Sequence, residues 1–307
     1  MRITQNTSSS NAIYNIQQQR SKLESLSESL TTGNKVNRPS DNPMSTGVLL
    51  DISDKLNAIE QYSTNITKAN TLLKFTDSTL TAMTNILKQT QKLMGTISSG
   101  STDPTMRQSA NDQLVDLKKQ IVEMANTQMG DQYIFGGAKS NVPPFNSVNN
   151  IYAGDSTQLT IEIARGTTQA VSLTGDRILK GTSTPVGTLP NYGSVDILKT
   201  FDDLIAGVGD TTTPSNIPLL NQGIVDLQNG YIQINNAIGD NINRMTRVDN
   251  ISTLNENNKN IMEQLVGNLQ NVDYARLGIE LNNQKTAFEA SLSATAKVSQ
   301  LSLLNYM

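Results

Sequence analysis

Apolar residues recur every seven positions along much of the amino-terminal third of the chain. The repeat runs through Ile52, Ile59, Ile66, Leu73, Leu80, Leu87 and Met94, and the same spacing occurs earlier at Ile16, Leu23 and Leu30. A sustained seven-residue repeat marks a seam along which helices pack lengthwise. The pattern therefore predicts two long helices, one on each side of residues 30–43.

Residues 30–43 read LTTGNKVNRPSDNP and interrupt the helical pattern. We expect the first helix to end at Thr32 with Gly33 in the left-handed position that follows a helix, because glycine adopts it without strain. Asn42 can cap the next helix, with Pro43 at its first position. Arg38 and Asp41 are placed to form a salt bridge across the segment. These residues predict a stiff interdomain joint made by Gly33, Arg38, Pro39, Asp41, Asn42 and Pro43.

Proline is absent from residues 44–103 and 219–307, which permits two very long helical regions. Asp103 and Pro104 repeat the pattern of a cap followed by proline. They predict a third helix that ends before Gly130 and presents Ala110, Leu114, Leu117, Ile121 and Met124. A last helix is expected over residues 240–304, with one seam through Leu254, Ile261, Leu265, Val272 and Ile279. Near Leu281 the stripe changes phase, which predicts a change of packing partner.

Between residues 133 and 191 the apolar period changes from helical to alternating. Leu159, Ile161 and Ile163 interleave with polar residues, as do Val171 and Leu173, with a turn expected at 165–166. We therefore predict a mainly α fold with a β-rich insertion, in which the amino- and carboxy-terminal segments form a long antiparallel helical bundle or coiled coil. The predicted domains are the terminal helices at 1–43 and 281–307, a central bundle at 44–137 and 194–280, and an outer insertion at 138–193.

The composition excludes several functional classes. The chain has 307 residues, a net charge of −3 and a pI near 5.1, so neither nucleic acid nor an anionic membrane is an expected partner. No apolar run approaches the roughly 20 residues that span a bilayer, and the polar amino terminus lacks the apolar core of a cleaved signal. Histidine and cysteine are both absent. We therefore expect no enzyme, no metal site and no cofactor.

Two short motifs have simple structural explanations. The run at 136–140, GGAKS, lacks the glycine that a phosphate-binding loop requires where Ala138 stands, so it is interpreted as a tight turn. Asp202 and Asp203 are adjacent, and adjacent residues of a helix do not face each other, so a solvated helix surface is expected there.

The terminal helices are sparsely apolar, and isolated helices are marginal in water. We therefore predict that both chain ends are disordered in the lone subunit and become ordered against other subunits. The predicted subunit interface consists of Ile13, Ile16, Leu23, Leu26, Leu30, Leu281, Phe288, Leu292, Val298 and Leu301.

These segments resemble a known family. The sequence of residues 30–43 is similar to the amino-terminal signature of bacterial flagellins, and residues 121–137, IVEMANTQMGDQYIFGG, are similar to the hook-associated branch. The first four residues and the ending AKVSQLSLLNYM resemble hook-associated proteins of type 3 more than filament flagellins. The similarity covers roughly residues 1–137 and 220–307.

The resemblance implies a structural subunit of the extracellular flagellum, exported unfolded by the flagellar type III apparatus without a cleaved signal peptide. It also implies an adaptor between hook and filament. The implied partners are copies of the chain in a ring, hook-associated protein type 1 on the hook side, flagellin on the filament side and an export chaperone. By position, Ile16, Leu23 and Leu30 would pair with Phe288, Leu292 and Val298 in an inner domain.

Alternatives remain open at this point. The chain could be a minor flagellin of the filament itself, or a secreted coiled-coil adaptor or translocator with one soluble partner. Peptidoglycan cleavage by carboxylates is a remote third option, because no spaced Asp/Glu constellation supports it.

Overall fold

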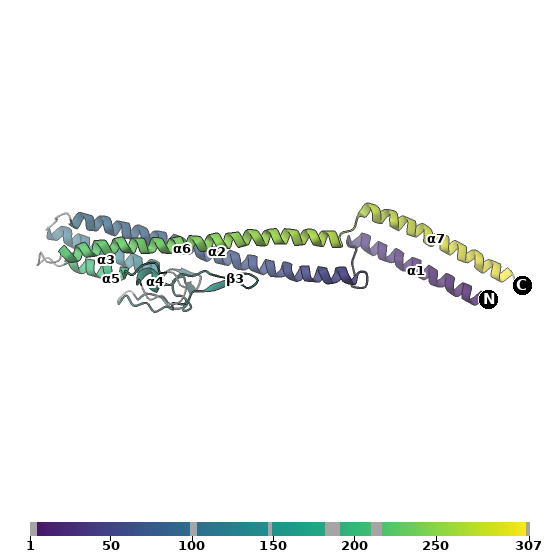
Figure 1. The fold of residues 1–307 in the computed structure, drawn as a ribbon, viewed down its shortest axis with the longest axis horizontal. Helices are drawn as coiled ribbons and strands as arrows, with labels where there is room; N and C mark the ends of the chain where they lie inside the picture. Colours follow the sequence, from purple (N-terminus) through teal and green to yellow (C-terminus); the bar gives the residue numbers. More distant parts are fainter. Residues whose placement is uncertain (1–4, 99–102, 147–148, 182–190, 210–216, 305–307) are drawn as a thin grey trace. The chain divides into compact units, whose positions relative to one another are not determined.

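The computed structural model describes residues 5–98, 103–146, 149–181, 191–209 and 217–304, and these form two compact units. One unit contains residues 1–58 and 257–307, and the other contains residues 59–256. The helices are α1 (Gln5–Thr32), α2 (Pro43–Ser98), α3 (Pro104–Ala125), α4 (Gly175–Leu179), α5 (Ile197–Gly209), α6 (Ile217–Gln270) and α7 (Tyr274–Leu304). The strands are β1 (Gln128–Met129), β2 (Gln132–Tyr133), β3 (Thr160–Ala164) and β4 (Thr167–Ala170). The predicted mainly α fold is confirmed (Figure 1).

The heptad stripe of α2 is the buried face of that helix. Its seven residues from Ile52 to Met94 are at most 9% exposed, and four of them are fully buried. In the 59–256 unit, Leu80, Leu87 and Met94 join a core from α3, α5 and α6, which includes Leu114, Phe201 and Ile234. The predicted stripe of α3 is buried as well, apart from the half-buried Met124. The seven-residue spacing therefore identified the core of a helical bundle.

Helix starts follow the predicted caps. The carboxylate of Asp103 accepts a hydrogen bond from the backbone N–H of Thr105 at 2.9 Å, and Pro104 opens α3. The side-chain carbonyl of Asn42 accepts from the N–H of Ser45 at 3.1 Å, and Pro43 opens α2. Each acceptor satisfies an amide that has no partner inside its own helix.

The insertion contains one antiparallel hairpin, β3 with β4, whose turn lies at 165–166 as predicted. Val171 and Leu173 were expected in a strand, but β4 ends at Ala170 and both residues follow it as buried irregular chain. Ile163 and Val171 pack with Ile66 of α2 and complete a second apolar cluster. The hairpin is therefore held to the helices partly by apolar contact.

Polar side chains of the helices hold the same segment by its backbone. The guanidinium of Arg244, 7% exposed, donates to the carbonyls of Ala170 and Ser172, each at 3.1 Å. Asn255 donates to the carbonyl of Ile163 at 3.1 Å. Such contacts satisfy main-chain groups and do not depend on the side chains that the insertion carries.

The prediction of one helix over 240–304 is wrong in two respects. α6 begins at Ile217, and residues 271–273 separate it from α7. The predicted seam also lacks cover within this chain, because Leu254, Ile261 and Ile279 are 51%, 63% and 66% exposed. The buried residues of α6 include Leu227, Ile234 and Val248 instead. None of the helices in the described part of the chain is both long and apolar enough to cross a membrane.

Candidate functional site

The two terminal helices lie side by side in the unit of residues 1–58 and 257–307 (Figure 1). A polar contact connects them near the middle of α1. The side-chain amide of Gln284, 9% exposed, donates to the backbone carbonyl of Gln19 at 3.1 Å and also to the side-chain oxygen of the same residue. The family resemblance implied that the two terminal helices pair, and the structure confirms that α1 contacts α7. The pairing of individual residues stays a prediction.

The predicted interface residues remain partly uncovered after α1 and α7 have paired. Ile13, Leu30 and Leu292 are 54%, 37% and 43% exposed. The half-buried members are Ile16, Leu23, Leu26, Leu281 and Phe288. The side chains of Val298 and Leu301 lie outside the described residues. Contact of these residues with another chain therefore stays a prediction, which their exposure allows.

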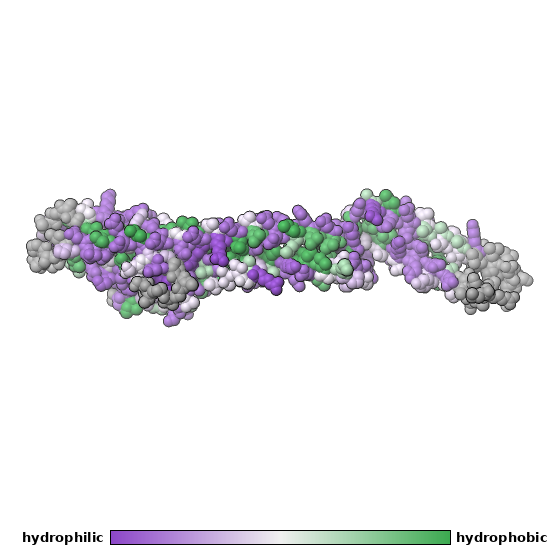
Figure 2. Space-filling view, viewed as in Figure 1, coloured by the Kyte–Doolittle hydropathy of each residue, from purple (hydrophilic) through white to green (hydrophobic). Residues whose placement is uncertain are grey.

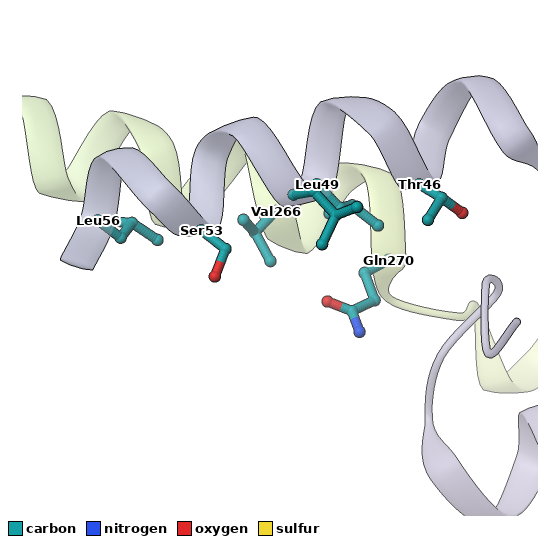
Figure 3. A pocket seen from close by; sticks show the side chains of 7 residues that line it. Thr46, Leu49, Ser53, Leu56, Val266 and Gln270 are labelled. Carbon is teal, nitrogen blue, oxygen red and sulfur yellow. The ribbon is translucent and has the colours of Figure 1, made fainter. Parts of the chain in front are cut away.

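Sequence reasoning missed an apolar groove between the start of α2 and the end of α6 (Figure 3). Its volume is about 320 Å³, and it is lined by Thr46, Leu49, Leu50, Ser53, Leu56, Val266 and Gln270. Apolar surface is visible over this part of both helices (Figure 2). Leu49 and Leu56 lie beside the heptad stripe that contains Ile52 and widen it, which is a signal that the sequence carries.

The joint is built as predicted at both helix ends. α1 ends at Thr32, Gly33 has a φ of +74°, and the N–H of Gly33 donates to the carbonyl of Ser29 at 3.0 Å. A residue with a Cβ would be strained at this φ, and its Cβ would lie 2.7 Å from the hydroxyl of Tyr274. Glycine therefore lets α1 end tightly against the start of α7.

The predicted salt bridge between Arg38 and Asp41 is wrong. The carboxylate of Asp41 accepts the backbone N–H groups of Asn37 and Arg38, at 3.1 and 2.9 Å. The guanidinium of Arg38 binds the carboxylate of Glu28 on α1 at 3.1 Å. The loop amides need an acceptor and take Asp41, while the long arginine side chain reaches back to the helix.

A second connector, residues 271–273, separates α6 from α7. Sequence analysis missed it because the apolar seam continues across these residues. Asp273 marks it in the sequence, since its carboxylate accepts the N–H groups of Ala275 and Arg276 at the start of α7. Asn271 pairs in an antiparallel bridge with Asn34, which lies in the first connector, residues 33–42 between α1 and α2. The two connectors are thus in direct contact.

The residues weighed for chemistry serve structure. Gly137 has a φ of +63°, and a Cβ there would lie 1.9 Å from the carbonyl oxygen of Asp155, so the GGAKS run makes a tight turn against the backbone. Asp202 binds Lys118 at 2.6 Å, and Asp203 binds Lys199 at 2.8 Å. Among the described residues no three acidic side chains gather as metal ligands.

One buried tyrosine has a perturbed hydroxyl. Burial and the neighbouring carboxylate of Asp240 raise the pKa of Tyr192, whose hydroxyl donates to Asp240 at 2.7 Å. Arg244 binds the same carboxylate at 2.8 Å. These groups hold the insertion to α6, and none of them lines the groove between α2 and α6.

Comparisons with known proteins agree with this architecture. Residues 3–140 match the family model described as the bacterial flagellin N-terminal helical region. Flagellar hook-associated protein 3 of Escherichia coli (strain K12) is 23% identical over 289 residues, which cover 90% of each chain. Its counterpart in Salmonella typhimurium (strain LT2) is 21% identical over 291 residues, 91% of this chain and 90% of the other.

Solved structures give the same result for the fold. A putative flagellar hook-associated protein from Vibrio parahaemolyticus superposes with a TM-score of 0.65 at 22% identity, covering 75% of this chain and all of that one. Hook-associated protein 3 from Legionella pneumophila gives a TM-score of 0.61 at 17% identity, covering 71% and 98%. The resemblance to the flagellin family, and within it to hook-associated protein 3, is confirmed.

Proposed function

We propose that this chain is a structural subunit of the bacterial flagellum that joins the hook to the flagellin filament. Two of its similar proteins are named flagellar hook-associated protein 3, and one similar structure is titled flagellar junction protein. The observation that carries the proposal is the apolar surface left on α1 and α7 after they have paired. Ile13 and Leu292 are 54% and 43% exposed there, which suits contact with further subunits.

Copies of the chain would form a ring or a short helical layer. Such a layer needs contacts that do not close in a dimer, so each subunit must present different surfaces to its two neighbours. The interface would use Ile13, Ile16, Leu23, Leu26, Leu30, Leu281, Phe288, Leu292, Val298 and Leu301. The apolar groove between α2 and α6, with Leu50 63% exposed at its edge, would add to it.

The layer would contact hook-associated protein type 1 on one side and flagellin on the other. An export chaperone would protect the apolar ends before assembly, and the chain would act outside the cell after export through the flagellum. The terminal helices at 1–43 and 281–307 would form the inner tube and the segments 44–137 and 194–280 the central domain. The insertion at 138–193 would face outward. An assembly subunit needs no active site, so we propose no enzymatic activity.

Electron microscopy of reconstituted hooks tests this role. Purified protein added to hooks that carry hook-associated protein type 1 should form a layer of limited length, and flagellin added afterwards should elongate from it. A chain lacking residues 1–30 should remain soluble and helical but fail to join hook ends, because its interface is gone.

Two results would contradict the proposal. Unlimited elongation of filament seeds by this protein alone would identify a minor flagellin. Normal joining by the chain that lacks residues 1–30 would favour a coiled-coil module with a soluble partner, because that role does not need the terminal helices.

A further inference from the structure

Two connectors, residues 33–42 between α1 and α2 and residues 271–273 between α6 and α7, are paired through their backbones. The N–H of Lys35 donates to the carbonyl of Gln270 at 2.6 Å, and the N–H of Val272 donates to the carbonyl of Gly33 at 3.0 Å. Asn34 and Asn271 face each other between these bonds as an antiparallel bridge. We call residues 33–35 together with 270–272 the clasp.

Side chains on both sides fix the shape of the clasp. The hydroxyl of Thr32 donates to the side-chain oxygen of Asn37 at 2.8 Å, and the amide of Asn37 donates to the carbonyl of Asn34 at 3.2 Å. On the other connector, Asp273 caps α7 directly after the bridge. The clasp thus lies between the last turn of α1 and the first turn of α7.

The contact between α1 and α7 contains few features by which α1 could select α7 of its own chain over α7 of another copy. Apart from Leu277, which is 7% exposed, the apolar residues of these two helices are half-buried or exposed where their burial is described. The cross-helix polar contact joins two glutamines, Gln284 and Gln19. In a layer of identical subunits, α1 of one copy could pair equally well with α7 of a neighbour. Exchange of identical elements between protomers is a common hazard of such assemblies.

We propose that the clasp selects α7 of the same chain as the partner of α1 and so prevents exchange of terminal helices between assembled copies. The need for such selection rests on the proposed function above. The clasp holds the ends of α1 and α7 together, which converts their pairing into an intramolecular step with a high effective concentration.

The length of the second connector supports this selection. Residues 271–273 can span only about 10 Å when extended. For α7 to reach α1 of another copy, the clasp would have to open and the two chains would have to approach within that reach. The backbone hydrogen bonds of Lys35 and Val272 would then be lost.

A cysteine pair can report which chain supplies the partner, because the natural sequence contains no cysteine. Asn34 and Asn271 form the type of antiparallel pair whose Cα atoms lie about 4.5 Å apart, within the range that a disulfide bridges. The variant with N34C and N271C in one chain is assembled on hooks, oxidised and run on a non-reducing gel. We expect an internal disulfide in a monomeric band.

The decisive arm mixes two single variants, N34C and N271C, before assembly and oxidation. A covalent dimer that contains one chain of each would overturn the proposal, because it requires clasp positions from different copies to meet. Complete absence of that dimer, with the internal link formed in the double variant, is the expected result. Hook joining is scored separately by electron microscopy of the same samples. Joined hooks with the mixed dimer would overturn the selection alone, and hooks that are not joined would overturn the proposed function.

A glycine substitution tests whether the shape of the clasp causes the selection. Gly33→Ala in the double-cysteine background should slow internal disulfide formation about tenfold, because a side chain at a φ of +74° costs roughly 1 to 2 kcal/mol. Gly130→Ala is the matched control, since Gly130 has a φ of +64° and open space around its Cβ position. Equal rates in the two variants would overturn the role of Gly33.

Discussion

Gln284 of α7 donates its side-chain amide to the backbone carbonyl of Gln19 on α1, across 265 positions of sequence. This hydrogen bond connects the two terminal helices, whose contact includes few buried apolar side chains. Leu277 and Gln284 are the buried side chains of α7 for which exposure is described, at 7% and 9%. The pairing of the terminal helices is therefore as much polar as apolar, which makes it sensitive to single substitutions.

Replacing Gln284 by alanine should weaken the α1–α7 pair by about 1 kcal/mol, because the hydrogen bond to Gln19 is lost. Hydrogen exchange across α1 should then become faster. Asn283→Ala, an exposed neighbour on the same helix, is the control and should leave α1 unchanged. Equal exchange in the two variants would show that the contact adds nothing.

In dilute solution, α1 should exchange its amide hydrogens much faster than the part of α2 that contains the buried Leu73 and Leu80. Few apolar groups of α1 are covered within one chain, whereas the α2 seam is closed on itself. Strong protection of residues 5–30 in the monomer would contradict assembly-coupled order of the ends.

Shortening a buried side chain of the α2 heptad stripe should lower the free energy of unfolding far more than shortening an exposed side chain of α6. Leu87→Ala should destabilise the chain by about 2 to 5 kcal/mol in urea unfolding, because Leu87 is fully buried. Leu254→Ala removes the same atoms from a side chain that is 51% exposed, and the change should stay within about 0.5 kcal/mol. Similar losses for both would mean that Leu254 is covered in solution.

The hold of α6 on the insertion depends on Arg244. Arg244→Met should remove the guanidinium donor of the Ser172 carbonyl and leave the Ala170 carbonyl with the side-chain amide of Gln169, at a cost of about 1 to 3 kcal/mol. Limited proteolysis should then cut the hairpin sooner. Arg247→Met changes an exposed arginine of the same helix and should leave the cleavage rate as it was.

The cap of α3 should contribute a pH-dependent part of stability. Hydrogen bonds from the hydroxyl and the N–H of Thr105 lower the pKa of Asp103 below its ordinary value of 3.8. A lowered pKa in the folded state favours folding above pH 3.8, and the contribution is lost as the pH falls through the folded value. Thermal unfolding of Asp103→Asn, which keeps a capping oxygen without a charge, should show a weaker loss of stability in acid. Parallel pH profiles would exclude this contribution.

Much of the fold follows from local signals in the sequence. The heptad stripe from Ile52 to Met94 predicted the buried face of α2 correctly. Gly33, Asn42 and Asp103 predicted helix ends correctly, because each of them acts on backbone groups a few residues away. The end of α1 and the start of α2 were therefore located correctly from a short segment, whereas its role as an interdomain joint stays a prediction.

Contacts between distant segments could not be predicted in the same way. Nothing near Asn271 in the sequence reveals its bridge to Asn34, and an apolar period that continues past residue 270 conceals the end of α6. Arg38 binds Glu28, ten positions away in the sequence, and not the nearer Asp41. In the folded loop the carboxylate of Asp41 already accepts backbone N–H groups, which the sequence alone does not reveal. Whether the terminal apolar rows contact other subunits is a property of an assembly and stays a prediction.

Asn65, Arg244 and Asn255 bind main-chain oxygens of the insertion. Every residue type carries the same backbone carbonyl, so a substitution that keeps the hairpin conformation keeps these acceptors. Substitutions at the outward positions of this segment can accumulate over generations without releasing it from the helices, so descendants can change their exterior while inheriting the same attachment.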